Sequence, residues 1–325
     1  MVDTRTLVGP ASMLAGRLQK NLTRLGPWLK KSGVTCFRAY DRDIPEVPLA
    51  IDVFGGEDGQ TFLMVIAWSP KHGGGAAFEA MVEGCADVAA AVLKTPRAQV
   101  VVQFREPGRG GELEAAEVEQ SSHSLVVREG PARFRLQLGA RRDPGLFLDH
   151  RPTRALVADV VTGRRVLNLF AYTGSFSVQA GLAGAASTLS VDLSASTCRW
   201  AEENLALNAL AGPAHRVLVA DALGFLDDDS SLWDVIVVDP PSFSKSRRTA
   251  RTFDVQRDHG TLIAAALARL APGGQIIFSC NRRDFRLEQD ALSSSIVVDD
   301  LTTVTTPPDF RGVPHHCFRI RGRSR

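Results

Sequence analysis

The sequence predicts an α/β protein in which a doubly wound parallel sheet follows a smaller α+β domain. The first observation is that hydrophobic runs alternate with helical patterns from Arg151 onward. The second is that two of these runs, RVLNLFAYTGSF at 165–176 and WDVIVVDPPSF at 233–243, each end in residues that could bind a ligand or take part in a reaction. The third is that two strands, a helix and further strands come earlier in the chain. We therefore expect one domain at 1–140 and a second at 141–325.

The elements of the smaller domain follow from hydrophobic periodicity. Leucines at helical spacing predict a helix over residues 13–31, which Gly26-Pro27 could kink or split. A second helix is expected at 76–93. Alternating patterns predict strands at 47–54, 61–68, 99–104, 124–127 and 133–138. We expect this domain to bind RNA or to position the substrate.

In the larger domain, predicted strands and helices alternate along the chain. The expected strands are 165–170, 187–191, 216–220, 235–238 and 275–278. The expected helices are 174–182, 195–210, 222–226 and 256–270. Two weaker strands, 296–304 and 316–320, would add an antiparallel edge to this sheet.

Composition narrows the functional classes. The chain has 325 residues, 44% of them hydrophobic and 23% charged, which is ordinary for a soluble globular protein. No apolar run approaches the length of a membrane span, and the first residues do not resemble a secretory signal, so we expect a cytoplasmic protein without membrane contact. The five cysteines are scattered, which makes a disulfide framework or a metal site unexpected.

Three strand ends predict a nucleoside site. In a doubly wound sheet the ligand lies beyond the carboxyl ends of the strands. Gly174 permits a close backbone approach in the turn after the first strand. Asp192 ends the second strand and could accept hydrogen bonds from both ribose hydroxyls, and Asp221 after the third could accept one from an adenine amine. We interpret this as the cleft for S-adenosylmethionine (SAM).

The fourth strand leads into the predicted reaction site. Asp239-Pro240-Pro241 offers a carboxylate and carbonyl groups as acceptors, because proline has no amide donor. Phe243 could stack on a flat base. Among methyltransferases such a sequence marks enzymes that act on nitrogen in planar groups, and it also occurs in enzymes that act on carbon.

A basic loop follows this motif. We expect it to contact phosphates of RNA, although a plain solvated face would look the same on a protein whose net charge is only +2. Its basic residues are Lys245, Arg247, Arg248 and Arg251.

Motifs along nearly the whole chain carry a resemblance to a known family. They are MLAGRLQKNLTRLGPWLKKSG at 13–33, GLFLDHR at 145–151, LNLFAYTGSFSV at 167–178, WAEENLALN at 200–208, DPPSFSKS at 239–246, FDVQRDH at 253–259 and HHCFRI at 315–320. With these the chain resembles the guanine-N7 methyltransferase half of RlmKL, the bifunctional bacterial 23S rRNA methyltransferases. The resemblance implies methylation of guanine N7 in 23S rRNA, with SAM as methyl donor and ribosomal RNA as partner.

The resemblance also implies that Phe147, Asp149 and Arg151 close over SAM. Together with the strand ends, this gives the predicted cofactor site. Its residues are Phe147, Asp149, Arg151, Asn168, Phe170, Tyr172, Thr173, Gly174, Ser175, Asp192, Leu193, Ser194, Asn208, Asp221, Ala222 and Asp239. The predicted catalytic residues are Asp239, Pro240 and Phe243.

One departure from the family leaves the target base open. Cys280 stands where the guanine-N7 pattern has asparagine, and related cytosine-C5 enzymes that resemble RlmI have a nucleophilic cysteine there. Cytosine C5 is a poor nucleophile and needs a thiolate to attack C6 first, whereas guanine N7 has a free lone pair. Cys280 is thus a catalytic candidate only under the cytosine alternative. A non-catalytic RNA-binding assembly factor is the remaining alternative, and the oligomeric state is open.

Overall fold

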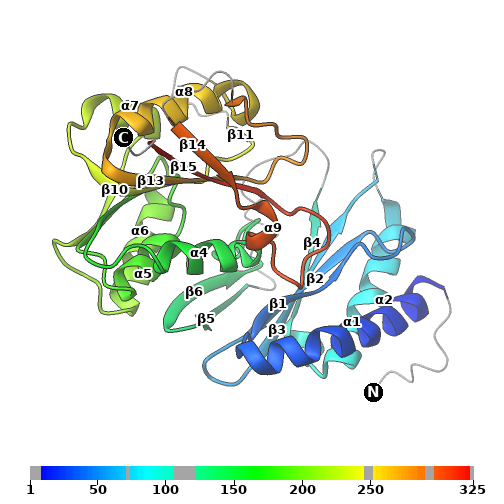
Figure 1. Cartoon of the computed structure of the whole chain (residues 1–325). Helices are drawn as coiled ribbons and strands as arrows, with labels where there is room; N and C mark the ends of the chain where they lie inside the picture. Colours follow the sequence, from blue (N-terminus) through cyan, green and yellow to red (C-terminus); the bar gives the residue numbers. More distant parts are fainter. Residues whose placement is uncertain (1–8, 71–73, 106–121, 245–251, 290–295, 323–325) are drawn as a thin grey trace. The chain divides into compact units, whose positions relative to one another are not determined.

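The computed structural model describes residues 9–70, 74–105, 122–244, 252–289 and 296–322 (Figure 1). The chain divides into two compact units, Met1–Leu148 with Pro308–Arg311, and Asp149–Pro307 with Gly312–Arg325. The division at Leu148 lies beyond the predicted boundary at residue 140. One reason is that Arg105 from β4 (Val100–Arg105) bonds the Arg142 carbonyl and Asp143, which keeps this stretch in the first unit.

The first unit contains a four-stranded sheet in the order β1-β2-β3-β4. Strands β3 and β4 are parallel and the other neighbours are antiparallel. Its first three strands are β1 (Cys36–Asp41), β2 (Leu49–Gly55) and β3 (Thr61–Trp68). β1 was not predicted from the sequence.

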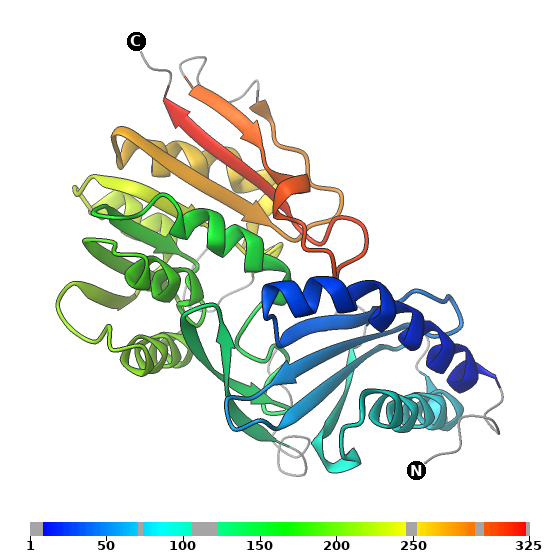
Figure 2. The ribbon, with the colours of Figure 1, turned by 60° about the horizontal axis from the view of Figure 1, so that its bottom comes forward.

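Helices α1 (Pro10–Ser32) and α2 (Gly75–Leu93) pack on this sheet and share one hydrophobic core with it (Figure 2). α1 buries Leu14, Leu18 and Leu25 on one face, as the periodicity predicted. It runs without interruption through Pro27, so the possible split at Gly26-Pro27 does not occur.

Two further pieces complete the first unit. The hairpin of β5 (His123–Glu129) and β6 (Ala132–Leu138) joins it through Glu57, whose amide donates to Val126 O at 2.8 Å. Residues 308–311 come from far along the chain, and the Asp309 carboxylate accepts a hydrogen bond from Arg38 N at 3.0 Å. This return of the chain was not expected from the sequence.

The second unit is built on a seven-stranded sheet in the order β14-β15-β13-β10-β7-β8-β9. Strands β13, β10, β7, β8 and β9 are parallel to one another, and β15 is antiparallel to both of its neighbours. The strands are β7 (Arg165–Leu169), β8 (Ser187–Asp192), β9 (His215–Val219), β10 (Trp233–Val238), β13 (Leu270–Cys280), β14 (Ile296–Asp300) and β15 (His316–Gly322). The predicted doubly wound sheet with an antiparallel edge is confirmed.

Helices cover both faces of this sheet. One core joins α4 and α5 to the sheet, and another joins α7 and α8 to it. The helices are α4 (Arg151–Ala158), α5 (Ser175–Leu182), α6 (Ala195–Leu207), α7 (Ala222–Asp228), α8 (Val255–Ala268) and the short α9 (Thr302–Thr305). α4 was not predicted, and the 3-10 turn η2 (Leu148–His150) leads into it.

The strand order reverses between β7 and β10, because β8 and β9 extend the sheet on one side of β7 and β13 on the far side of β10. Ligands of open α/β sheets bind at such a switch point, beyond the carboxyl ends of the strands.

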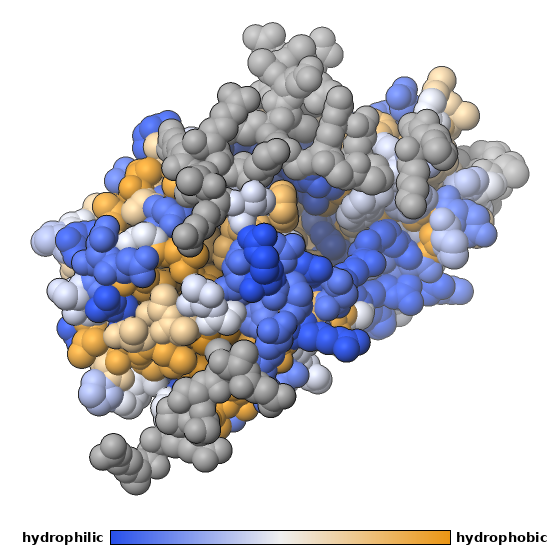
Figure 3. Space-filling model, turned by 90° about the horizontal axis from the view of Figure 1, so that it is seen from above, coloured by the Kyte–Doolittle hydropathy of each residue, from blue (hydrophilic) through white to orange (hydrophobic). Residues whose placement is uncertain are grey.

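Figure 3 shows hydrophobic areas interspersed with hydrophilic ones on one face of the molecule. Among the described residues, no helix combines the length and apolarity that crossing a membrane requires.

Candidate active site

The turn that follows β7 has an uncommon backbone. Phe170 and Tyr172 have positive φ values of 56° and 50°, and Gly174 has a φ of 75°. Residues other than glycine rarely adopt such values, and they persist where the surroundings enforce them, often at functional sites. Here Asn204 from α6 donates a hydrogen bond to Thr173 O at 2.9 Å. The protein therefore holds this turn in one shape by its own contacts.

Asp192, the last residue of β8, holds the same turn from the other side. Its Oδ2 accepts a hydrogen bond from Tyr172 N at 2.9 Å, while its Oδ1 accepts from Ser194 N at 2.9 Å and Thr197 Oγ1 at 3.0 Å. Ser194 itself caps α6, so Asp192 is not needed as the cap. A carboxylate offers about four lone-pair sites, and Asp192 can therefore still accept from a ribose hydroxyl.

Two predicted cofactor residues lie in the packing around the turn. A Cβ at Gly174 would meet the Ala201 Cβ at 3.0 Å, so this glycine also permits α5 and α6 to pack closely. Asn168 is 1% exposed and donates to Ser177 Oγ at 3.1 Å. The Asn168 side chain supports the turn from within the core, and its contact with the cofactor stays a prediction.

The end of β9 leads to Asp221, the N-cap of α7. Its Oδ2 accepts a hydrogen bond from Gly224 N at 3.0 Å, and Ala222 behind it is buried. A helix cap accounts for this aspartate without a ligand, so its contact with an adenine amine stays a prediction. Leu193 and Asn208 are partly buried, and Asn208 donates to Asn204 O at 2.7 Å.

Asp239 directly follows β10 and is held at both carboxylate oxygens. Oδ1 accepts a hydrogen bond from Ser279 Oγ at 2.7 Å, and Oδ2 lies 3.5 Å from His150 Nε2. Pro240 is buried, whereas Phe243 is 59% exposed. Phe243 begins β11 (Phe243–Ser244), which pairs with β12 (Phe253–Asp254). A half-buried carboxylate thus lies four residues before an exposed aromatic ring.

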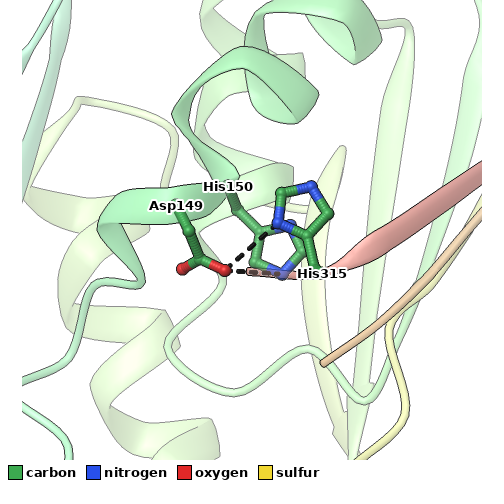
Figure 4. A group of neighbouring side chains, drawn as sticks. All are labelled: Asp149, His150 and His315. Carbon is green, nitrogen blue, oxygen red and sulfur yellow. Dashed lines mark hydrogen bonds and ion pairs between the residues drawn. The ribbon is translucent and has the colours of Figure 1, made fainter. Parts of the chain in front are cut away.

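Asp149, His150 and His315 form a cluster (Figure 4), and His150 brings this cluster to Asp239. Asp149 Oδ2 lies 3.2 Å from His315 Nδ1 and 4.0 Å from His150 Nε2, and the two imidazole rings stack with centroids 4.2 Å apart. Burial lowers the pKa of His150, against the opposing effect of the nearby Asp239 and Asp149 carboxylates. The Asp149 carboxylate is engaged by His315 within this cluster, so the three side chains hold one another in place.

Cys280 ends β13 but does not share the face of Asp239. Side chains alternate along a strand, and Ile276, Phe278 and Cys280 belong to the core under α7 and α8, whereas Ser279 bonds Asp239. The thiol is fully buried, and burial raises its pKa to about 12. A thiol in this state is a poor nucleophile because the thiolate is the reactive form.

The motif FDVQRDH at 253–259 has structural roles. Asp254 caps α8 by accepting from Gln256 N and Arg257 N, and it pairs with Arg282 at 2.9 Å. His259 is buried, and its Nε2 accepts from Glu288 N at 3.1 Å. The contacts of this motif fix the residues that follow β13.

The remaining predicted residues belong to the GLFLDHR motif and the basic loop. Phe147 belongs to the first unit and is 37% exposed, while Arg151 begins α4 in the second. The predicted RNA-binding residues Lys245, Arg247, Arg248 and Arg251 lie outside the described residues. Sequence reasoning named neither His150 nor His315 nor Ser279, although both histidines lie within motifs that carried the resemblance.

The geometry fits a nucleoside cofactor with a reactive group at one end. The parallel strands bring the turn after β7 together with Asp192, Asp221 and Asp239 at one edge of the sheet. The Asp192 carboxylate, an acceptor for the ribose hydroxyls, then lies at the end of β8. The Asp239 carboxylate, at the predicted reaction site, lies across the switch point after β10. SAM, when bound there, supplies an electrophilic methyl group. This fold and this site are those of a class I SAM-dependent methyltransferase.

Comparison with known proteins agrees. A family model described as S-adenosylmethionine-dependent methyltransferase matches residues 63–317, and the chain belongs to this family. Proteins named ribosomal RNA large subunit methyltransferase K/L are 42% identical over 96% of the chain in Chromohalobacter salexigens and 40% identical over 95% of it in Methylococcus capsulatus. The chain spans 42% of the length of each of these relatives.

Solved structures show the same fold. The SMU.776 methyltransferase, crystallised with S-adenosylhomocysteine (SAH), is 20% identical with a TM-score of 0.76, covering 97% of this chain and 82% of that one. A SAM-dependent methyltransferase from Streptococcus mutans gives a TM-score of 0.74 with the same identity and coverage.

Proposed function

We propose that the chain methylates N7 of a guanine in the RNA of the large ribosomal subunit, 23S rRNA. The observation that carries the proposal is the pair of relatives named rRNA large subunit methyltransferases, which are 40–42% identical over nearly the whole chain. The half-buried Asp239, four residues before the exposed Phe243, supports a planar, electron-rich acceptor.

The chemistry that these residues must perform is limited. Guanine N7 has a lone pair in the ring plane, so it can attack the methyl group without losing a proton. The bond between sulfur and methyl breaks, the bond between N7 and methyl forms, and the positive charge passes to the base. The protein must therefore unstack the base, aim N7 and offset the developing charge.

Particular residues of the chain would perform each part of this work. Phe243 offers a ring face on which the base can stack, and Pro240 restrains the backbone that follows Asp239. The Asp239 carboxylate offsets the charge that develops on the base, or accepts from its Watson–Crick edge. The loop with Lys245, Arg247, Arg248 and Arg251 would meet phosphates of the RNA.

Nucleoside analysis tests the proposal. Purified protein, SAM and unmodified 23S rRNA are expected to yield 7-methylguanosine, detected by mass spectrometry after digestion. A yield of 5-methylcytidine, together with a covalent adduct on RNA that contains 5-fluorocytidine, would establish the cytosine alternative. A protein that binds RNA but shows no SAM binding by calorimetry would be an assembly factor instead.

A further inference from the structure

Two sequence motifs far apart in the chain meet beside Asp239. GLFLDHR at 145–151 contributes Asp149 and His150, and HHCFRI at 315–320 contributes His315. The three side chains place one nitrogen or oxygen atom each within 4.8 Å of the others. His150 is the member that reaches Asp239, because its Nε2 lies 3.5 Å from Oδ2.

His315 is held at both ring nitrogens. Its Nδ1 lies 3.2 Å from Asp149 Oδ2, and its Nε2 lies 3.3 Å from Thr153 Oγ1 and 3.3 Å from Thr305 Oγ1. The ring is buried and cannot turn without breaking these contacts. Because His315 stacks on His150 at 4.2 Å, it fixes the plane of the second ring as well. The His150 ring also packs edge-to-face with Phe176, with ring centroids 5.8 Å apart.

We infer that His150 is a positioning residue for the reaction: its neutral ring donates from Nε2–H to Asp239 Oδ2, while Ser279 donates to Oδ1. The two donors fix the direction of the carboxylate and leave its negative charge in place. His315, which is held by Asp149, stacks on the His150 ring and fixes it. This inference rests on the proposed function, since the charge to be offset is that of the methylated base.

Hydrogen-bond distance and charge both fit this role. A separation of 3.5 Å is long, but catalytic hydrogen bonds are often long before substrate binds. A neutral imidazole can donate without cancelling the charge of Asp239, whereas an imidazolium would form an ion pair and compete with the base for it. His150 must therefore be neutral when the enzyme works.

The groups that face His150 support the neutral form. Burial lowers its pKa first of all, the carboxylates of Asp239 and Asp149 raise it, and His315 and Arg154 lower it further. Cys317 on β15 is also close to this cluster, but burial raises the pKa of its thiol to about 12, so it carries no charge. The net result of these effects is that the pKa of His150 lies below the ordinary histidine value of about 6.5. Activity should therefore fall only when the pH drops through that lowered pKa.

The first test needs no RNA. Long-range ¹H–¹⁵N NMR of the histidine rings should show His150 as the neutral Nε2–H tautomer at pH 7, assigned by its loss in His150→Gln. The Nδ1–H tautomer or an imidazolium at pH 7 would overturn the inference, whatever base the enzyme methylates. So would stoichiometric zinc in the purified protein together with loss of that zinc in His150→Gln.

The second test uses two replacements and pH-rate profiles. His150→Phe keeps a ring but no donor, and kcat should fall by about 10-fold or more while the KM for SAM changes by less than about twofold. His150→Gln keeps an amide donor that cannot become cationic, so it should retain most of the rate and lose the acid limb. His215→Gln is the matched control, since this partly buried histidine starts β9, at the opposite end from the site, and burial also lowers its pKa.

Full activity in His150→Phe, or an unchanged acid limb in His150→Gln, would contradict the positioning role. These outcomes differ from failure of the proposed function, which would appear in the wild-type protein as a product other than 7-methylguanosine.

Discussion

Asp192 ends β8 and Asp239 follows β10, the strands on either side of β7, yet the protein holds the two carboxylates by different means. Asp192 accepts from two backbone amides and a threonine hydroxyl, none of which changes charge with pH. Asp239 accepts from the Ser279 hydroxyl and faces the imidazole of His150. The first aspartate shapes a turn with fixed dipoles, whereas the second is set in a titratable environment.

The different environments of the two carboxylates correspond to two tasks, binding the cofactor and transferring the methyl group. A cofactor with neutral ribose hydroxyls needs a rigid acceptor of constant charge, which the end of β8 provides. The methyl acceptor gains a positive charge, and the opposing carboxylate after β10 must keep its own charge at working pH. We therefore expect replacements on the cofactor side to change binding of SAM and replacements on the reaction side to change the rate.

Asp239→Ala is expected to have the largest effect, a fall in kcat of about 10²–10³-fold, because it removes the charge that offsets the methylated base. The affinity for SAM, measured by calorimetry, should change by less than about tenfold. Asp239→Asn keeps the shape and should show a comparable loss of rate. Equal activity in the asparagine variant would mean that charge is not the essential property.

Replacing Lys245, Arg247, Arg248 and Arg251 together with alanine should weaken binding of RNA and leave binding of SAM unchanged. The log–log slope of RNA affinity against salt should flatten by roughly one unit for each phosphate contact that is lost. A slope equal to that of the wild type would identify the loop as an ordinary solvated face.

Asp192→Ala should weaken SAM binding by about 1–3 kcal/mol, because a charged hydrogen bond to the ribose is lost. Thr197→Val is a control for the structural part, since it removes a donor to Asp192 but leaves the carboxylate in place. Titration calorimetry on both variants separates the two contributions. Unchanged affinity in Asp192→Ala would exclude this residue from the ribose site.

Gly174→Ala should lower the free energy of unfolding by about 1–2 kcal/mol for its positive φ alone, with a further loss from the contact with Ala201. Gly130→Ala is the matched control, because Gly130 also has a positive φ, 57°, but a Cβ added there would meet no described atom within 4 Å. Urea unfolding of the two variants measures the difference. Equal losses would show that packing against α6 is unimportant.

Cys280→Ser should have the smallest effect on catalysis, with methylation retained within about threefold, since a buried thiol with a raised pKa is a poor nucleophile. Cys280→Ala controls for the cost of placing a hydroxyl in the core. Abolished methylation in both stably folded variants would favour cytosine C5 as the target.

Much of the second unit was predictable from local patterns. Each strand of the parallel sheet has a short apolar run, and Asp192, Asp221 and Asp239 come directly at or after strand ends, where a doubly wound sheet places its ligand. β1 and α4 escaped prediction. β1 pairs with β2 and α4 packs against α5. These partners lie outside the short segments whose hydrophobic patterns would have to predict β1 and α4.

The sequence by itself determined the class of fold, the position of the cofactor turn and the aspartates at its edge, because hydrophobic periodicity and strand ends are local properties. Only the tertiary structure decided that His315 meets His150 beside Asp239, that Cys280 faces the core, and that residues 308–311 return to the first unit. Those outcomes depend on which distant segments pack together and on which face of a strand each side chain falls, and no local pattern fixes either.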